Sequence, residues 1–169
     1  MTPTLASLRM GLDRRFANAF EPTRPNLAEA LARALDMGAY VGRSQALARD
    51  GYAEEALDRL EDAQIAAARC LEALVGARLS QGFRGTAHVA RKHFLVVALE
   101  AWGYPAPPVE VLIATTRLRN LLTYEFTTAD SQFDETALTA SREATERIQA
   151  AIKAIVSTAG SAVEEGGMT

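Results

Sequence analysis

The sequence has one cysteine, few aromatic residues and no long hydrophobic run, and each scarcity excludes a class of protein. Cys70 has no partner for a disulfide within the chain, so we expect a reducing compartment. Charged residues at positions 9, 13, 14 and 15 interrupt the N-terminal stretch, which therefore lacks the apolar segment of a signal peptide. No apolar run approaches the roughly 18–20 residues of a membrane-spanning helix. We therefore predict a cytoplasmic protein that does not enter the membrane.

An excess of positive charge is also missing. The 18 lysines and arginines are outnumbered by 21 aspartates and glutamates, and the net charge is −3. Proteins that rely on nonspecific phosphate contacts usually carry a large basic excess, so nucleic acid can bind this chain only through a local patch. Residues 82–85, GFRG, are too few for a phosphate-binding glycine loop and follow a predicted helix instead of a strand.

Helical periodicity runs through most of the 169 residues. Alanine is abundant, β-branched residues dominate no window, and each strongly periodic segment repeats every 3.6 residues rather than every two. The sequence thus predicts an all-α, up-and-down bundle of five to seven helices with no strand pair. It forms one domain over 1–159, followed by a flexible tail over 160–169. We expect helices over about 3–20, from 27 onward, and over about 52–80, 87–102, 109–126 and 135–158.

Local signals indicate where some of these helices begin and end. Asn26 is expected to cap the second helix, and residues 50–51, Asp-Gly, to form a turn. Gly38 and Gly42 are expected to weaken the continuation of this second helix. The middle of the fourth helix, FLVVAL at 94–99, is apolar on every side, which predicts that this helix is the central and most buried one.

No pattern typical of metal or nucleophile chemistry is present. His88 and His93 are five residues apart, whereas two ligands on one helical face are three or four apart. We interpret His93 as a partly buried structural histidine and Cys70, which lies among alanines, as a small core residue. The acidic run of the third helix is interpreted as a solvated face, because no Glu-x-x-His pair accompanies it. We therefore predict no metal and no cofactor. The acidic residues are Glu54, Glu55, Asp58, Glu61 and Asp62.

The fifth predicted helix combines an apolar side with a polar one. At about 100° per residue, the two sides separate clearly. Leu112 and Ile113 lie on the polar side, one to two turns earlier than the polar residues, so we expect a second protein surface to cover this side. A solvent-exposed face with a salt-bridged arginine is the alternative. The apolar side, expected to face the bundle, carries Val111, Ala114, Leu118, Leu121 and Leu122. The polar side carries Thr116, Arg119, Asn120 and Tyr124.

The end of this helix, RNLLTYEF at 119–126, resembles the signature of the HEPN family (higher eukaryotes and prokaryotes nucleotide-binding domains). That signature has an arginine, commonly an asparagine after it, a histidine five residues after the arginine, and often a tyrosine two residues further on. Arg119 and Asn120 match it, whereas Tyr124 stands at the histidine position and Phe126 at the tyrosine position. The resemblance in helical organisation covers roughly 50–159.

The resemblance implies a compact bundle that dimerises and brings two copies of the motif together in a cleft. Many members are metal-independent RNases, often toxins paired with a nucleotidyltransferase-like antitoxin. Arg119, Asn120 and Tyr124 are then the candidate catalytic residues, and Thr116, Leu112 and Ile113 are candidates to line a ligand site or an interface. A tyrosine with its ordinary pKa of about 10 is a poor base at neutral pH, so we expect little nuclease activity.

Three hypotheses about function follow from the sequence. The first is a HEPN-like homodimer with a degenerate motif that binds RNA, a nucleotide or a partner protein and acts as a regulatory module. The second is an active HEPN-type RNase, the toxin of a toxin–antitoxin pair, in which Tyr124, His88 or His93 replaces the missing histidine. The third is an unrelated helical module for protein interaction.

Overall fold

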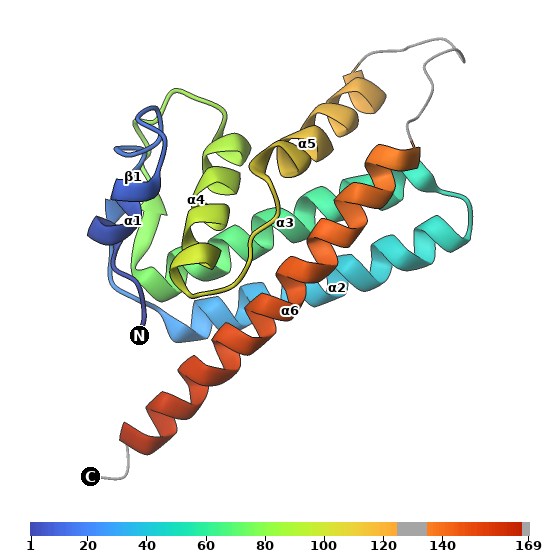
Figure 1. Cartoon of the computed structure of the whole chain (residues 1–169). Helices are drawn as coiled ribbons and strands as arrows, with labels where there is room; N and C mark the ends of the chain where they lie inside the picture. Colours follow the sequence, from blue (N-terminus) through green and yellow to red (C-terminus); the bar gives the residue numbers. More distant parts are fainter. Residues whose placement is uncertain (125–134, 167–169) are drawn as a thin grey trace.

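The chain folds into a bundle of helices, which confirms the predicted fold class (Figure 1). The computed structural model describes residues 1–124 and 135–166, and of residues 122–124 it describes only the backbone. Within these residues there are six helices and one pair of short strands. The elements are α1 (Leu5–Gly11), β1 (Phe20–Pro22), α2 (Leu27–Arg49), α3 (Ala53–Val75), β2 (Ala77–Leu79), α4 (Ala87–Ala101), α5 (Val109–Tyr124) and α6 (Glu135–Gly166).

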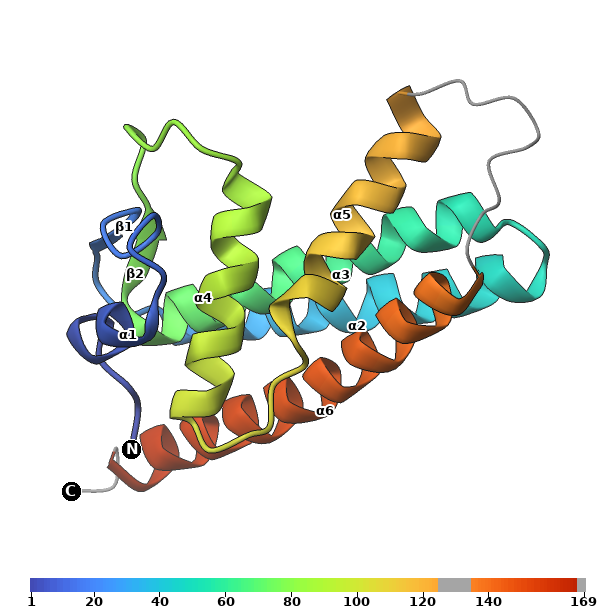
Figure 2. The same ribbon diagram turned by 45° about the horizontal axis from the view of Figure 1, so that its top comes forward.

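Helix α3 is the centre of the bundle. It contacts α2, α4, α5 and α6, with α2 antiparallel beside it and α6 running across both (Figures 1 and 2). Thirteen residues of α3 are buried, against six of α4. The prediction that 87–102 is the most buried helix is therefore wrong. Many of the buried residues of α3 are alanines, and such small side chains let helices approach it from several sides.

The second helix begins and ends where the sequence predicts. The Asn26 side chain accepts a hydrogen bond from the Glu29 amide at 3.0 Å, which confirms the predicted cap. Gly51, with φ of 87°, forms the turn into α3. Helix α2 continues through Gly38 and Gly42 to Arg49, contrary to the prediction, because it packs against α3 and α6, and such packing outweighs a propensity cost of about 1 kcal/mol per glycine.

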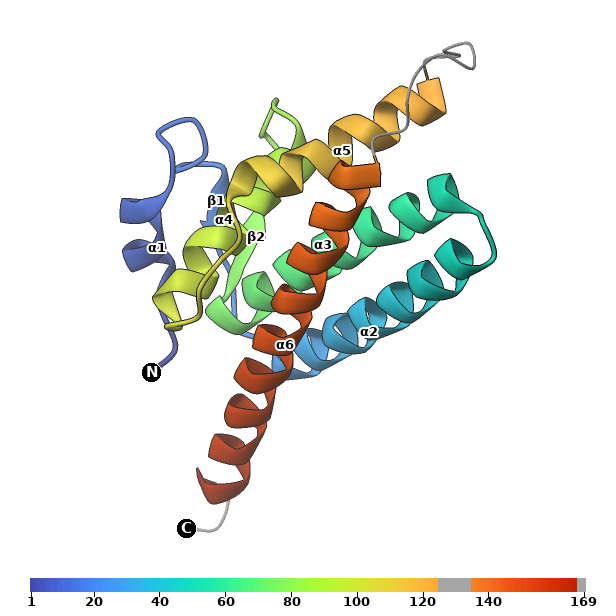
Figure 3. The same ribbon diagram turned by 45° about the vertical axis from the view of Figure 1, so that its right-hand side comes forward.

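The N-terminal part differs most from the prediction. Helix α1 ends at Gly11 instead of continuing to residue 20, and β1 then pairs antiparallel with β2, Phe20 opposite Leu79. The sequence predicted no strand pair, because three residues per strand show no alternation and the two strands are far apart in the chain. Figure 3 shows α1 and this pair beside α4, at one end of the bundle.

The core confirms two smaller predictions. Cys70 is fully buried, and burial raises the pKa of its thiol to about 12. His93 is half-buried, with its ring 4.6 Å from the ring of Phe16. Helix α6 continues to Gly166, so the predicted helix end near 158 and the predicted tail from 160 both come too early. Among the described residues, no helix is both long and apolar enough to traverse a bilayer.

Candidate functional site

Three helices cross around a buried pair of opposite charges. Glu61 of α3 and Lys92 of α4 are completely buried, and the Lys92 ammonium donates a hydrogen bond to the Glu61 carboxylate. Lys92 also donates to the backbone oxygen of Leu112, at 2.7 Å, and to the Thr116 hydroxyl, at 2.5 Å, both on α5. The three donor hydrogens of the ammonium therefore all have acceptors, as burial of a charge requires.

The carboxylate of Glu61 is equally well satisfied. Its Oε1 lies 2.8 Å from Nδ1 of His88, and the Thr116 hydroxyl donates to it at 3.1 Å. Burial raises the pKa of Glu61, but the hydrogen bond to His88 and the charge of Lys92 outweigh burial, so the pKa lies below its usual value. Burial lowers the pKa of Lys92, and the ion pair with Glu61 opposes that change. We call Glu61, His88, Lys92 and Thr116 the buried ionic cluster.

Arg119 lies beside this cluster, at the boundary with solvent. Its Nε donates to Oδ1 of Asp58 at 2.7 Å, and its side chain is 31% exposed. Asp58 also binds Arg59 at 2.8 Å, and Arg59 binds Asp62 at 3.0 Å. These four residues form a network at the surface, in which the guanidinium of Arg119 is held in place but remains within reach of solvent.

Helix α3 brings Arg119 and His88 to neighbouring positions. Arg119 binds Asp58 and His88 binds Glu61, and the two carboxylates are three residues apart on α3. Residues at this spacing lie on the same helical face with Cβ atoms about 5–6 Å apart. An arginine and a histidine are therefore anchored about one helical turn apart.

A second set of buried polar groups holds α3, α5 and α6 together. The side-chain nitrogen of Gln64 lies 3.1 Å from the hydroxyl of Thr115, 3.0 Å from that of Thr145 and 3.4 Å from that of Ser141. All four side chains are buried. These contacts fix the rotation of α5 about its axis, and so determine which of its residues face inward.

That rotation contradicts the predicted orientation of α5. Leu112 is completely buried and Thr116 is 6% exposed, so this part of the side predicted to face outward packs against α3 and α4, whereas Asn120 of the same side is exposed. Leu121, predicted to face the bundle, is 41% exposed. Ile113 is half-buried. The apolar side chains suggested the wrong face because the inward face of α5 carries the threonines that bind the buried polar groups.

Among the described side chains, two other predicted site residues, Ile113 and Asn120, do not join the cluster. Asn120 is exposed, one residue beyond Arg119. Tyr124 is the last residue of α5, its side chain lies outside the described part of the structure, and Phe126 lies outside it altogether. Of the predicted residues, the structure brings together Arg119, Thr116 and the backbone of Leu112.

Two central residues of the cluster were missed by the sequence analysis. Glu61 was assigned to a solvated acidic face, although it follows buried Leu57 by four positions and so shares its side of the helix. Lys92 precedes buried Leu95 and Leu99 by three and seven positions, which places it in the apolar stripe of α4. A charge in phase with an apolar stripe is the signal that could have revealed both residues.

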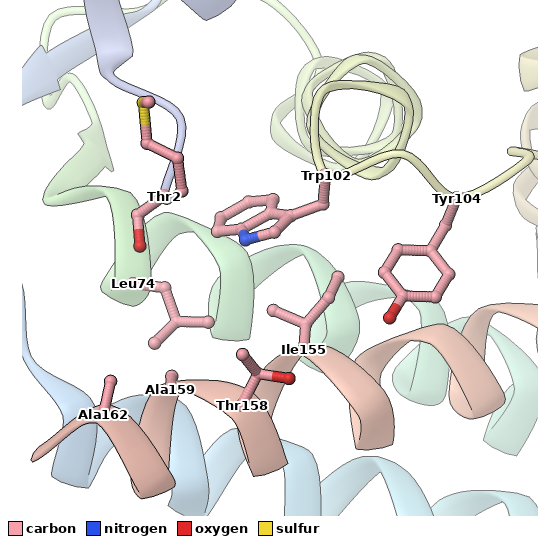
Figure 4. A pocket seen from close by; sticks show the side chains of 9 residues that line it. Thr2, Leu74, Trp102, Tyr104, Ile155, Thr158, Ala159 and Ala162 are labelled. Atoms are coloured by element: carbon pink, nitrogen blue, oxygen red, sulfur yellow. The ribbon is translucent and has the colours of Figure 1, made fainter. Parts of the chain in front are cut away.

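An apolar pocket of about 320 Å³ lies at the other end of the bundle. Trp102 and Tyr104 point from the end of α4 and the following loop toward Ile155 and Thr158 of α6 (Figure 4). No charged side chain lines this pocket, so it holds no lysine, arginine or histidine to pair with a phosphate. Within the described residues there is also no group of three or more histidine, cysteine or carboxylate side chains that could hold a metal ion.

Comparison of the chain with models of protein families, with curated proteins and with solved structures finds no match.

Proposed function

We propose that this chain is a HEPN-like helical domain that binds a phosphate group of RNA or of a nucleotide at Arg119, as a regulatory binding module. One observation carries the proposal: Arg119 is fixed at the surface by Asp58, directly beside the buried ionic cluster. The resemblance of 119–126 to the HEPN signature supports the same residue independently.

The energetics of the cluster support a functional role. Replacement of a buried ion pair by apolar residues is often neutral or stabilising, so stability alone does not explain Glu61 and Lys92. Titratable groups with perturbed pKa values cluster at functional sites, and the pKa values of both Glu61 and Lys92 are shifted. Here the buried pair ties α3, α4 and α5 together at the level of Arg119, which gives a rigid base for the guanidinium.

Arg119 is also suited to exchange its carboxylate partner for a phosphate. Among the described residues, Arg119 is bound through its Nε, to Asp58, and the planar guanidinium can present its other nitrogens to two phosphate oxygens. When a phosphate takes Arg119, Asp58 retains its ion pair with Arg59. Release of Arg119 therefore leaves no carboxylate without a partner.

The proposal includes weak or absent cleavage of the bound RNA. An arginine cannot transfer protons near neutral pH, and the Thr116 hydroxyl is buried and bound to Glu61. Loss of general acid–base catalysis typically costs about 100- to 10,000-fold in rate. With tyrosine at the position of the motif histidine, we expect binding of RNA without efficient hydrolysis.

The spacing of Asp58 and Glu61 favours one alternative, an RNase in which His88 supplies the missing imidazole. Its Nδ1 is held by the Glu61 carboxylate, which orients the ring and leaves Nε2 for proton transfer. The His88 side chain is 38% exposed, so a substrate can reach it. In this case the chain acts as a metal-independent toxin, and a nucleotidyltransferase-like antitoxin is its expected partner.

Homodimerisation of this chain remains a prediction, but a different residue has to form the interface. Leu112 was its motivation, and Leu112 is buried within its own chain. The exposed Leu121, next to Asn120 on the outer side of α5, is the apolar residue that this region offers to a second copy. In a homodimer formed through Leu121, the Arg119 side chains of the two copies lie on neighbouring surfaces.

The test is fluorescence anisotropy with a labelled single-stranded RNA at several salt concentrations. Arg119→Ala should weaken binding about 10-fold and reduce the slope of log K against log salt by about 0.7. Arg117→Ala is the matched control, since Arg117 is an exposed arginine of the same helix. Equal effects of the two variants, or no RNA binding by the wild type, would disprove the proposal.

The same samples distinguish the alternative. RNA incubated with the wild type should remain intact on a denaturing gel, and Tyr124→His is expected to increase any cleavage. Robust cleavage by the wild type that His88→Ala abolishes, with RNA binding retained, would instead establish the RNase.

A further inference from the structure

A polar cavity of about 460 Å³ lies among the N-terminus of α2, the second half of α3, strand β2 and α4. Its lining is unusually rich in arginine for a chain whose net charge is −3. The four arginines outnumber the two glutamates, which leaves a local charge of +2. The charged residues of the lining are Arg24, Arg69, Arg78, Arg91, Glu29 and Glu72.

Two of these arginines form no direct ion pair. Arg91 binds Glu72 at 2.9 Å, and Arg78 binds Glu21, outside the cavity lining, at 2.7 Å. Within the described part of the chain, no hydrogen bond or ion pair is formed by Arg24 or Arg69. Glu29 of the lining lies 3.7 Å from Arg33, and both Glu72 and Glu29 attract Arg69 without a direct ion pair. Arg24 and Arg69 are therefore the two guanidinium groups of the lining whose hydrogen-bond donors remain available to a ligand.

Further positive charge surrounds Arg69. Burial lowers the pKa of Arg69, and the neighbouring Arg33 and Arg91 lower it further. Helix α2, capped by Asn26, begins at the cavity, and the N-terminus of a helix carries a partial positive charge. An anion in the cavity would relieve this repulsion.

We propose that this cavity binds a phosphate monoester, the terminal phosphate of a nucleotide or of another small phosphorylated molecule. Two free guanidinium groups match the two negative charges of such a group, and arginine pairs with phosphate through parallel hydrogen bonds. The volume of the cavity lies in the range of small-molecule sites.

The cavity is separate from the site at Arg119. Arg69 and Asp58, the partner of Arg119, are eleven residues apart on α3, which corresponds to about 16 Å along the helix. The lining of the cavity includes neither Arg119 nor any residue of the buried ionic cluster. The inference therefore does not depend on the proposed function, and each site can fail without the other.

Isothermal titration calorimetry of the whole chain in phosphate-free buffer tests the proposal with orthophosphate, AMP and adenosine. Orthophosphate and AMP should bind, and adenosine should not. Similar affinities for the first two would identify a site for free phosphate, whereas tighter binding of AMP would indicate a nucleotide. Arg24→Gln and Arg69→Gln should each weaken binding at least about 10-fold, the effect of one charge-assisted hydrogen bond.

Arg43→Gln is the matched control, because Arg43 is an exposed arginine of α2 that does not line the cavity. Arg24 is exposed in a loop, so we expect Arg24→Gln to fold. This variant therefore tests the cavity even if Arg69→Gln does not fold. The proposal is overturned if neither orthophosphate nor AMP binds, or if Arg24→Gln and Arg43→Gln bind equally well. Loss of phosphate binding in Arg119→Ala alone would also overturn it, by placing the phosphate at the other site.

Discussion

The replacement of Lys92 by methionine is the most direct test of the buried ionic cluster. Methionine retains the length of the side chain but removes a charge that binds Glu61, Thr116 and the backbone oxygen of Leu112. Glu61 then remains buried without its main counterion. Removal of one member of a buried ion pair typically costs about 3–5 kcal/mol in the free energy of unfolding, and we expect Lys92→Met to fall in this range at pH 7.

The pH dependence of the stability lost in Lys92→Met shows whether the unpaired Glu61 carboxylate causes the loss. In the wild type the pKa of Glu61 lies below its ordinary value, so its stabilising contribution is complete above that value and is lost as the pH falls through the folded pKa. Without Lys92, burial becomes the dominant effect and raises the pKa of Glu61. The ionised carboxylate of Glu61 then destabilises the fold near neutral pH, and this destabilisation decreases as the group becomes protonated. The difference in the free energy of unfolding between Lys92→Met and the wild type should therefore shrink as the pH is lowered.

Urea denaturation followed by circular dichroism, at pH 7 and at pH 5, provides the measurement. Lys153→Met is the matched control, because Lys153 is exposed on α6 and is the other lysine of the chain. The double variant Glu61→Leu/Lys92→Met removes both charges and should recover most of the stability. A loss below about 1 kcal/mol in Lys92→Met, or a double variant less stable than Lys92→Met itself, would refute the reasoning.

The other predictions each concern a single residue. Glu61→Gln should flatten the acid limb of the stability profile below pH 4.5, measured by urea denaturation between pH 6 and 3, because the depressed carboxyl pKa is then absent. Gly76→Ala should destabilise by more than about 1 kcal/mol, since φ is 74° and a Cβ would lie 2.6 Å from a backbone oxygen. Gly42→Ala, in open space within α2, should instead stabilise by about 0.5–1 kcal/mol, and thermal denaturation of both variants checks the pair. Cys70, fully buried with its pKa raised to about 12, should react with a thiol reagent only at the rate of unfolding; fast reaction of the folded protein would contradict this. If Leu121 lies in a dimer interface, Leu121→Asp should shift the mass in light scattering toward the monomer, and a monomeric wild type would exclude the dimer.

The sequence determined most of the helices, because helix formation depends on nearby residues. Asn26 caps α2 as predicted, and the turn after residue 49 lies where Asp-Gly indicated it. The range of α4 was predicted to within one residue, between Thr86 and the proline-rich segment after Trp102. These features follow from hydrogen bonds and backbone preferences within a few residues of the chain.

Only the tertiary structure decided how α5 is oriented and which charges are buried. The periodicity of α5 placed Leu112 outward and Leu121 inward, and both predictions are wrong. The ammonium of Lys92 and the carboxylate of Glu61 need acceptors and donors from a third helix, and Thr116 supplies them only with this face turned inward. A hydrophobicity pattern counts threonine and lysine as surface residues, whereas a buried charge recruits polar partners from distant segments. The position of Arg119 beside the buried ionic cluster therefore depends on how the helices pack in the folded bundle. The local sequence was sufficient to predict that Arg119 lies in a helix.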